Sequence, residues 1–190
     1  RLKKGALIGT GSPRRKSQLL RLRPDLKIKN LRGNLDTRIK KLENGEFDAI
    51  IAAMAGIKRL GYKNLSLECL PSEIMLPAAG QGALGIEIRT KDKIADNFAK
   101  ILTDLDTLRC VGSERAFLKE TEAGCRLPVG ALAQIKNRRI FLETKVLSPD
   151  GKRVISLKKS ANASDFESLG RTLAKEAIKK GAKQILKTNE

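Results

Sequence analysis

The chain has 190 residues, of which 41% are hydrophobic, enough for one ordinary domain or two small ones with a hydrophobic core. An excess of 39 Lys and Arg over 21 Asp and Glu leaves a net charge of +18, which favours anionic partners: nucleic acid, acidic lipids, or small molecules with phosphates or carboxylates. With no histidine and no C-x-x-C pair among its three cysteines, the chain lacks the familiar zinc and haem ligands, and no apolar run is long enough to span a membrane.

Residues 1–76 alternate between strand and helix patterns, which is typical of βαβ units built on a parallel sheet. Strands are predicted over 6–8, 26–31 and 47–54, with helices over 13–22 and 34–42 between them. Ser12 and Pro13 predict the N-cap and first residue of the first helix, and Asn34 predicts the cap of the second. We therefore expect an α/β domain with a doubly wound sheet.

A stretch rich in proline and glycine, LPAAGQG, occupies residues 76–82 and predicts a hinge. An apolar strand pattern over 83–88 and an amphipathic helix pattern over 91–102 follow it. A strand at this place has few neighbours left in the chain with which to pair, and the chain opens without methionine. We therefore expect a piece of a larger protein, in which residues 77–103 return to a domain that is mostly absent.

Residues 104–190 have the pattern of a small α+β domain. A helix is predicted over 106–120, and strands over 130–135, 140–147 and 152–158, with turns at 137–138 and 149–151. A last helix, capped by Ser164, places apolar residues on one face: Leu169, Leu173, Ala177 and Ile178. This order predicts a three-stranded antiparallel sheet and two helices.

Arginines follow each of the three predicted parallel strands. Because the carboxyl ends of parallel strands share one crevice, these guanidiniums are expected to converge there, beside helix N–H groups and two hydroxyls. The set is Thr10, Ser12, Arg14, Arg15, Arg32, Arg38 and Arg59. Arginine binds carboxylates bidentately, so we favour a polycarboxylate or phosphate pocket over the alternative of a capped helix with surface arginines. The turn lacks Walker and G-x-G-x-x-G spacing, so a nucleotide is not indicated.

Cys125 lies in the turn GCRLP and is the cysteine most open to a chemical role. The glycine before it favours accessibility, and Arg126 favours the thiolate. The alternative is a buried, inert thiol, because the chain has no histidine to act as its base. Cys110 falls within a helix pattern and Cys69 in a leucine-rich stretch, so both are predicted to be packing residues.

Six stretches in order resemble one family, the porphobilinogen deaminases, also called hydroxymethylbilane synthases. They are IGTGSPRRKSQLLRLRPDL, NLRGNLDTRIKKL, FDAIIAAMAGIKRLG, LPAAGQGALGIE, SERAFLKETEAGCRLPVGALA and SPDG. The resemblance covers nearly the whole chain and implies two domains like those of periplasmic binding proteins, followed by a third. On this basis residues 1–76 are the second domain, 77–103 the hinge and return to the first, and 104–190 the third.

The resemblance also implies a reaction and a cofactor. The family condenses four porphobilinogen molecules head to tail, with loss of ammonia, on a dipyrromethane cofactor held by a thioether to a cysteine that matches Cys125. Every pyrrole carries acetate and propionate groups, for which an arginine crevice is suited. The cofactor contacts implied are Thr10, Ser12, Arg14, Arg15, Arg32, Gly33 and Asn34, and the substrate contacts are Arg32, Arg38, Arg59 and Gln81.

The catalytic aspartate of the family matches no residue here, so we expect the chain alone to have no deaminase activity. Gly11, Pro13 and Ala123 depart from the residues usual in the family, although a proline suits a first helical position. The family further implies a monomer, without nucleic acid or membrane, and the odd number of cysteines favours a reducing cytoplasm.

Two other functions remain open from the residues alone. A basic nucleic-acid-binding protein is suggested only by the net charge of +18, and the aromatic content of 3% leaves few surfaces for base stacking. A solute-binding module without catalysis would share the α/β architecture, but it leaves the Cys125 turn and the third domain without a role.

Overall fold

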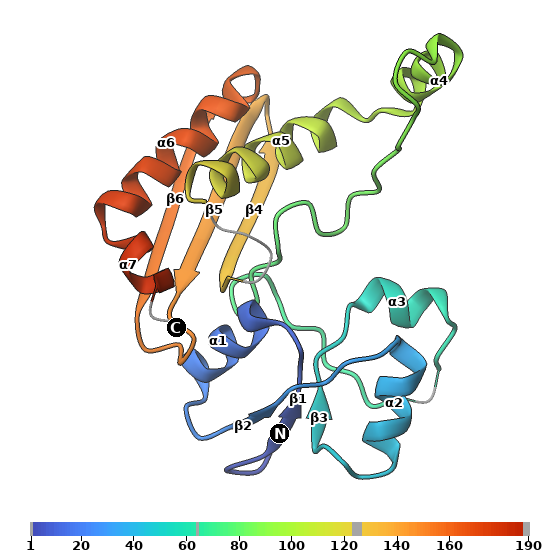
Figure 1. The fold of residues 1–190 in the computed structure, drawn as a ribbon, viewed down its shortest axis with the longest axis vertical. Helices are drawn as coiled ribbons and strands as arrows, with labels where there is room; N and C mark the ends of the chain where they lie inside the picture. Colours follow the sequence, from blue (N-terminus) through green and yellow to red (C-terminus); the bar gives the residue numbers. More distant parts are fainter. Residues whose placement is uncertain (1, 64, 123–126, 188–190) are drawn as a thin grey trace.

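The computed structural model describes residues 2–63, 65–122 and 127–187 (Figure 1). The first unit contains β1 (Leu7–Gly9), α1 (Pro13–Leu22), β2 (Lys27–Lys29), α2 (Leu35–Glu43), β3 (Ala49–Ile50) and α3 (Met54–Arg59). Next come α4 (Lys93–Leu102), α5 (Leu105–Glu120), β4 (Val129–Lys136), β5 (Arg139–Leu147), β6 (Val154–Asn162), α6 (Phe166–Lys179) and α7 (Ala182–Lys187). Among the described residues, no helix combines the length and apolar character needed to cross a bilayer.

The first unit is a parallel sheet in the order β2–β1–β3, as the alternating pattern predicts. Ile8 of β1 is paired with Ile28 on one side and with Ala49 on the other, and it is 1% exposed. The third strand is shorter than predicted, because the chain leaves the sheet after Ile50 and begins α3 at Met54. The run of apolar residues thus indicated a strand here but not its length, and most of the segment is only half-buried.

Both helix starts follow the capping chemistry of the sequence. The Ser12 hydroxyl accepts a hydrogen bond from the Arg15 N–H, and Pro13 is the first residue of α1. Asn34 caps α2, where its side-chain oxygen accepts the Thr37 N–H at 2.9 Å. Side chains of this kind satisfy N–H groups that have no partner within the helix, so the start of each helix is determined locally.

The prediction of a strand over 83–88 is wrong, since these residues form no strand. A strand needs a neighbour, and neither described sheet includes this segment. Its apolar side chains are consequently in solvent, with Leu84 98% exposed. The amphipathic α4 that follows buries none of its residues, and in Figure 1 it stands away from both sheets.

The second unit is the predicted antiparallel sheet, in the order β4–β5–β6, with α5 and α6 across one face (Figure 1). Its core includes Phe117 from α5, Ile140 and Leu142 from β5, and Leu173 from α6, all 0% exposed. The expected cap Ser164 lies instead in a short 3-10 turn, and α6 begins at Phe166 without a side-chain cap. The final helix α7 was not predicted.

The two units meet at the turn between β5 and β6. The Ser17 hydroxyl of α1 donates to the Pro149 carbonyl at 3.2 Å, and the Arg21 guanidinium donates to the Lys152 carbonyl at 2.9 Å. Gly151 has φ of +72°, and a Cβ there would lie 2.5 Å from the Ser17 carbonyl oxygen. This glycine therefore permits the close approach of the turn to α1.

Candidate functional site

A hollow of about 280 Å³ lies at the carboxyl edge of the parallel sheet. Its residues come from the segments directly after β1 and β2 and from the starts of α1 and α2. They are Thr10, Gly11, Ser12, Arg15, Leu31, Arg32, Gly33 and Arg38. This is the edge at which open α/β sheets bind their ligands.

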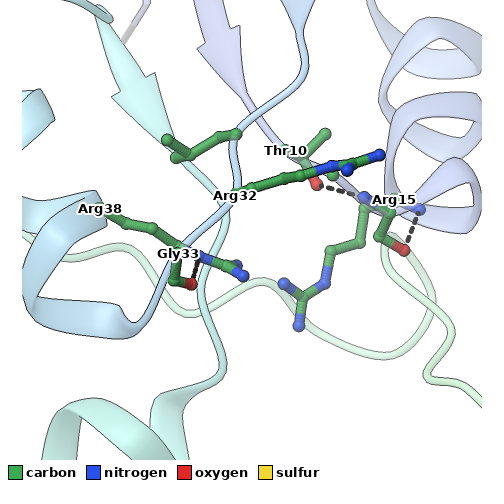
Figure 2. Close-up of a pocket in the computed structure, with 8 residues that line it drawn as sticks. Thr10, Arg15, Arg32, Gly33 and Arg38 are labelled. Atoms are coloured by element: carbon green, nitrogen blue, oxygen red, sulfur yellow. Dashed lines mark hydrogen bonds between the residues drawn. The ribbon is translucent and has the colours of Figure 1, made fainter.

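Two of the three arginines are held by backbone carbonyls. The Arg15 guanidinium donates to the Ile51 carbonyl at 3.0 Å, directly after β3, and Arg38 Nε donates to the Gly33 carbonyl at 2.8 Å. Figure 2 shows the guanidiniums of Arg15 and Arg38 facing each other, with the Arg32 side chain extended toward α1. These carbonyls leave other N–H donors of both groups available to a ligand.

The hollow is strongly cationic. Burial, together with the nearby charge of Arg38, lowers the pKa of Arg15 below its usual range. No residue that lines the hollow is acidic, and none of the ion pairs between described residues includes Arg15, Arg32 or Arg38. Guanidiniums brought together without carboxylates repel one another, so an anionic ligand would relieve the repulsion.

Polar main-chain and hydroxyl groups complete one wall. Thr10 is 5% exposed, and its hydroxyl accepts the Ser12 N–H at 3.2 Å. The first turn of α1 begins at Pro13 beside them, so the positive end of the helix dipole adds to the charge of the arginines. The arrangement suits the binding of carboxylates or phosphates.

Other predicted site residues lie outside this lining. Arg14, although next to Arg15 in α1, is buried, and its guanidinium donates to the Leu76 carbonyl at 2.5 Å and to Oε1 of Gln81 at 2.9 Å. Burial, then the charge of Arg15, lowers the pKa of Arg14 to about 10. Arg59 is exposed at the end of α3. Asn34 caps α2 and does not line the hollow.

Cys125 lies outside the described residues, so its predicted role stays a prediction. Cys69 is exposed, so the prediction that it is a packing residue is wrong. Cys110 is half-buried in α5, where burial, and next the charge of Glu114, raises the pKa of the thiol. In the described part of the chain, no group of histidine, cysteine, aspartate and glutamate side chains is arranged to hold a metal ion.

The sequence reasoning missed Gly11 and Leu31 in the lining, as well as the Ile51 carbonyl that holds Arg15. The need for glycine at position 11 is visible only in the structure, where a Cβ would lie 2.9 Å from the Leu31 carbonyl oxygen. Such contacts join segments that are distant in the chain, and no local pattern indicates them.

Fold and site together define an α/β unit with a cationic hollow at the carboxyl edge of its sheet, followed by an α+β unit. Residues 1–97 match a family model described as "Porphobilinogen deaminase, dipyromethane cofactor binding domain", and residues 108–179 match "Porphobilinogen deaminase, C-terminal domain". The chain belongs to the porphobilinogen deaminase family. The whole arginine hollow lies within the region that matches the cofactor-binding model.

Individual relatives agree with this assignment. The chain is 45% identical over 185 residues to the porphobilinogen deaminase of Carboxydothermus hydrogenoformans, covering 97% of this chain and 60% of the relative. It is 44% identical to the porphobilinogen deaminase of Buchnera aphidicola from Acyrthosiphon pisum, covering 97% of this chain and 59% of that protein. The chain therefore spans about three fifths of the length of these relatives.

Proposed function

We propose that this protein acts in hydroxymethylbilane synthesis, the condensation of four porphobilinogen molecules with loss of ammonia. In this proposal the hollow binds the acetate and propionate groups of the pyrrole chain, and Cys125 anchors the dipyrromethane cofactor. The observation that carries it is the meeting of Arg15, Arg32 and Arg38 at one hollow without an acidic residue in its lining.

The residues present fit a polycarboxylate cofactor. When bound, the dipyrromethane would supply the pyrrole end on which the chain of substrate units grows. Arg15 and Arg38 would each pair with a carboxylate through the donors that their backbone carbonyls leave free. Arg32, which is exposed at the rim, would bind a carboxylate of an incoming unit. The role of these side chains is to bind and orient, because arginine stays protonated and is a poor proton donor.

The decisive test is a covalent adduct on Cys125. The purified chain is incubated with hydroxymethylbilane, whose hydroxymethyl carbon forms a C–S bond to the cysteine while its C–O bond breaks and water leaves. Denaturing intact mass and peptide mapping should place a pyrrole adduct on the peptide that contains Cys125. The adduct should be absent from Cys125→Ser.

Cys69→Ser is the matched control, because Cys69 is an exposed thiol to which no anchoring role is assigned. This variant should keep the adduct in full. An unmodified Cys125, or an adduct that disappears only when Cys69 is replaced, would contradict the anchoring role. The protein would then be better described as an anion-binding module without the cofactor.

We also propose the domain organisation of the family: 1–76 as a domain like those of periplasmic binding proteins, 77–103 as hinge and return, and 104–190 as the cofactor-anchoring domain. The apolar face of residues 84–102 would then pack on the part of the relatives that lies outside the match, which is consistent with a family model that extends to residue 97. Co-expression with the unmatched part of the Carboxydothermus relative should give co-purification, and its failure would contradict this packing.

The setting we propose is the cytoplasm, with the protein acting as a monomer on small molecules and without nucleic acid or a membrane. The odd number of cysteines, three, argues against a disulfide framework and supports a reducing compartment. The 3% aromatic content gives little surface for base stacking. Light scattering at several concentrations checks the oligomeric state, and a concentration-dependent mass would contradict the monomer.

A further inference from the structure

Helix α1 buries three polar side chains that do not line the arginine hollow. Its buried residues are Arg14, Ser17 and Gln18, whereas Leu22 is 52% exposed. Burial of polar side chains costs free energy unless they are hydrogen-bonded, so their contacts are specific rather than incidental. These contacts determine where α1 sits.

Gln18 makes the most complete of these contacts. It is 3% exposed, its Oε1 accepts the Leu76 N–H at 2.8 Å, and its Nε2 donates to the Leu76 carbonyl at 3.0 Å. The Arg14 guanidinium donates to the same carbonyl. Because one side-chain amide both accepts from and donates to a single residue, it restricts the rotation of α1 as well as its position along the segment.

Leu76 is itself held firmly. It is 0% exposed, and a Cβ on Gly130 would lie only 3.1 Å from its Cβ, so β4 packs directly against it. The Ala131 N–H donates to the carbonyl of the next residue, Pro77, at 3.0 Å. The partner of Gln18 is therefore a segment bound to the second sheet, and it provides a rigid reference for α1.

We propose that Gln18 is a positioning residue for the arginine hollow, and that it acts through Arg15. The inference rests on the proposed role of the hollow as a carboxylate site. The backbone of Arg15 is fixed by α1, and its guanidinium is held by the Ile51 carbonyl. If α1 rotated about its axis, the guanidinium would move out of alignment with the hollow. Binding groups need to be held within about 0.5 Å of the productive geometry, which a buried amide supplies and an apolar side chain does not.

The test uses Gln18→Met, which keeps the length and burial of the side chain but has no amide. Binding of benzene-1,3,5-tricarboxylate is measured by calorimetry at low ionic strength, well below the melting temperatures. We expect about tenfold weaker binding in the folded variant, equivalent to about 1.4 kcal/mol. Ile140→Val, in the buried core of the second sheet, should lower the melting temperature without changing the affinity.

A double-mutant cycle with Arg15→Gln separates positioning from general stability. If Gln18 acts through Arg15, Gln18→Met has little further effect on affinity once Arg15 is replaced. Unchanged affinity in Gln18→Met, or an equal fold-loss with and without Arg15, overturns the inference. If Gln18→Met does not fold, Gln18→Asn, one methylene too short to reach both Leu76 groups, replaces it in the same cycle with the same expectations.

The outcomes also separate this inference from the proposed function. If the wild-type chain does not bind the tricarboxylate, both the carboxylate site and the positioning role of Gln18 are contradicted. A wild-type chain that binds it, with Gln18→Met equally tight, removes only the positioning role and leaves the carboxylate site in place.

Discussion

Replacing Arg15 by glutamine should weaken carboxylate binding by roughly 10- to 150-fold. A hydrogen bond to a charged group contributes about 1.5–3 kcal/mol, and each 1.4 kcal/mol is tenfold in affinity. Arg15 is the guanidinium held between α1 and the end of β3, so its replacement removes a charged donor of fixed geometry from the lining. Calorimetric titration with benzene-1,3,5-tricarboxylate measures the change directly.

Lys16→Gln is the matched control for Arg15→Gln. Lys16 is the next residue of α1, carries the same charge, is exposed, and does not line the hollow. Its loss should change the affinity less than about twofold at 0.15 M salt, where exposed charges are screened over about 8 Å. Equal losses in the two variants would mean that the ligand responds to the net charge of the chain, and the hollow would no longer be a specific site.

Gly170→Ala should destabilise the second unit, against the usual effect of this substitution. In a helix interior, alanine is more stable than glycine by about 0.5–1 kcal/mol. Here a Cβ at position 170 would lie 2.2 Å from the Ser113 carbonyl oxygen and 2.8 Å from the Ala116 Cβ, so α6 would have to move away from α5. Overpacking costs about 1–3 kcal/mol, so we expect a lower urea midpoint, monitored by circular dichroism.

Gly56→Ala in α3 is the control for this prediction. The nearest atom to its Cβ would be the Leu35 Cδ2, at 3.2 Å, at the end of a flexible side chain. This variant should be as stable as the wild type or more so. If Gly170→Ala were equally stable, α5 and α6 would not pack as closely as the structure places them.

Most features formed by contacts between residues close in sequence were predicted correctly, whereas a strand that needs a distant partner was not. The start of α1 at Pro13 and the cap of α2 at Asn34 were predicted to the residue, because capping bonds join groups three residues apart. The strand expected over 83–88 failed because a strand is completed by a partner elsewhere in the chain. Ser164 does not cap α6 because residues 163–165 form a 3-10 turn, after which α6 begins at Phe166.

The candidate site was also predicted only in part, because most of its residues could be found from sequence but their contacts could not. Arginines after successive strands were enough to predict a cationic crevice, and three of the five line one hollow. Arg14 and Arg15 are neighbours in sequence, but they point about 100° apart around α1, as the 3.6-residue period requires. Only the contacts with Leu76 and Gln81 decide that Arg14 is the buried one.

By itself, the sequence determined the alternation of strands and helices in the first unit, the caps of α1 and α2, the antiparallel second sheet and the family of the chain. These depend on the local periodicity of apolar residues, on turn and cap chemistry, and on motifs in a definite order. The tertiary structure alone decided which arginines meet, that α1 buries a polar face through Gln18, and that α4 has no partner among the described residues. The reason is that such features arise from contacts between residues far apart in the chain, whose geometry is set only when the two sheets are packed together.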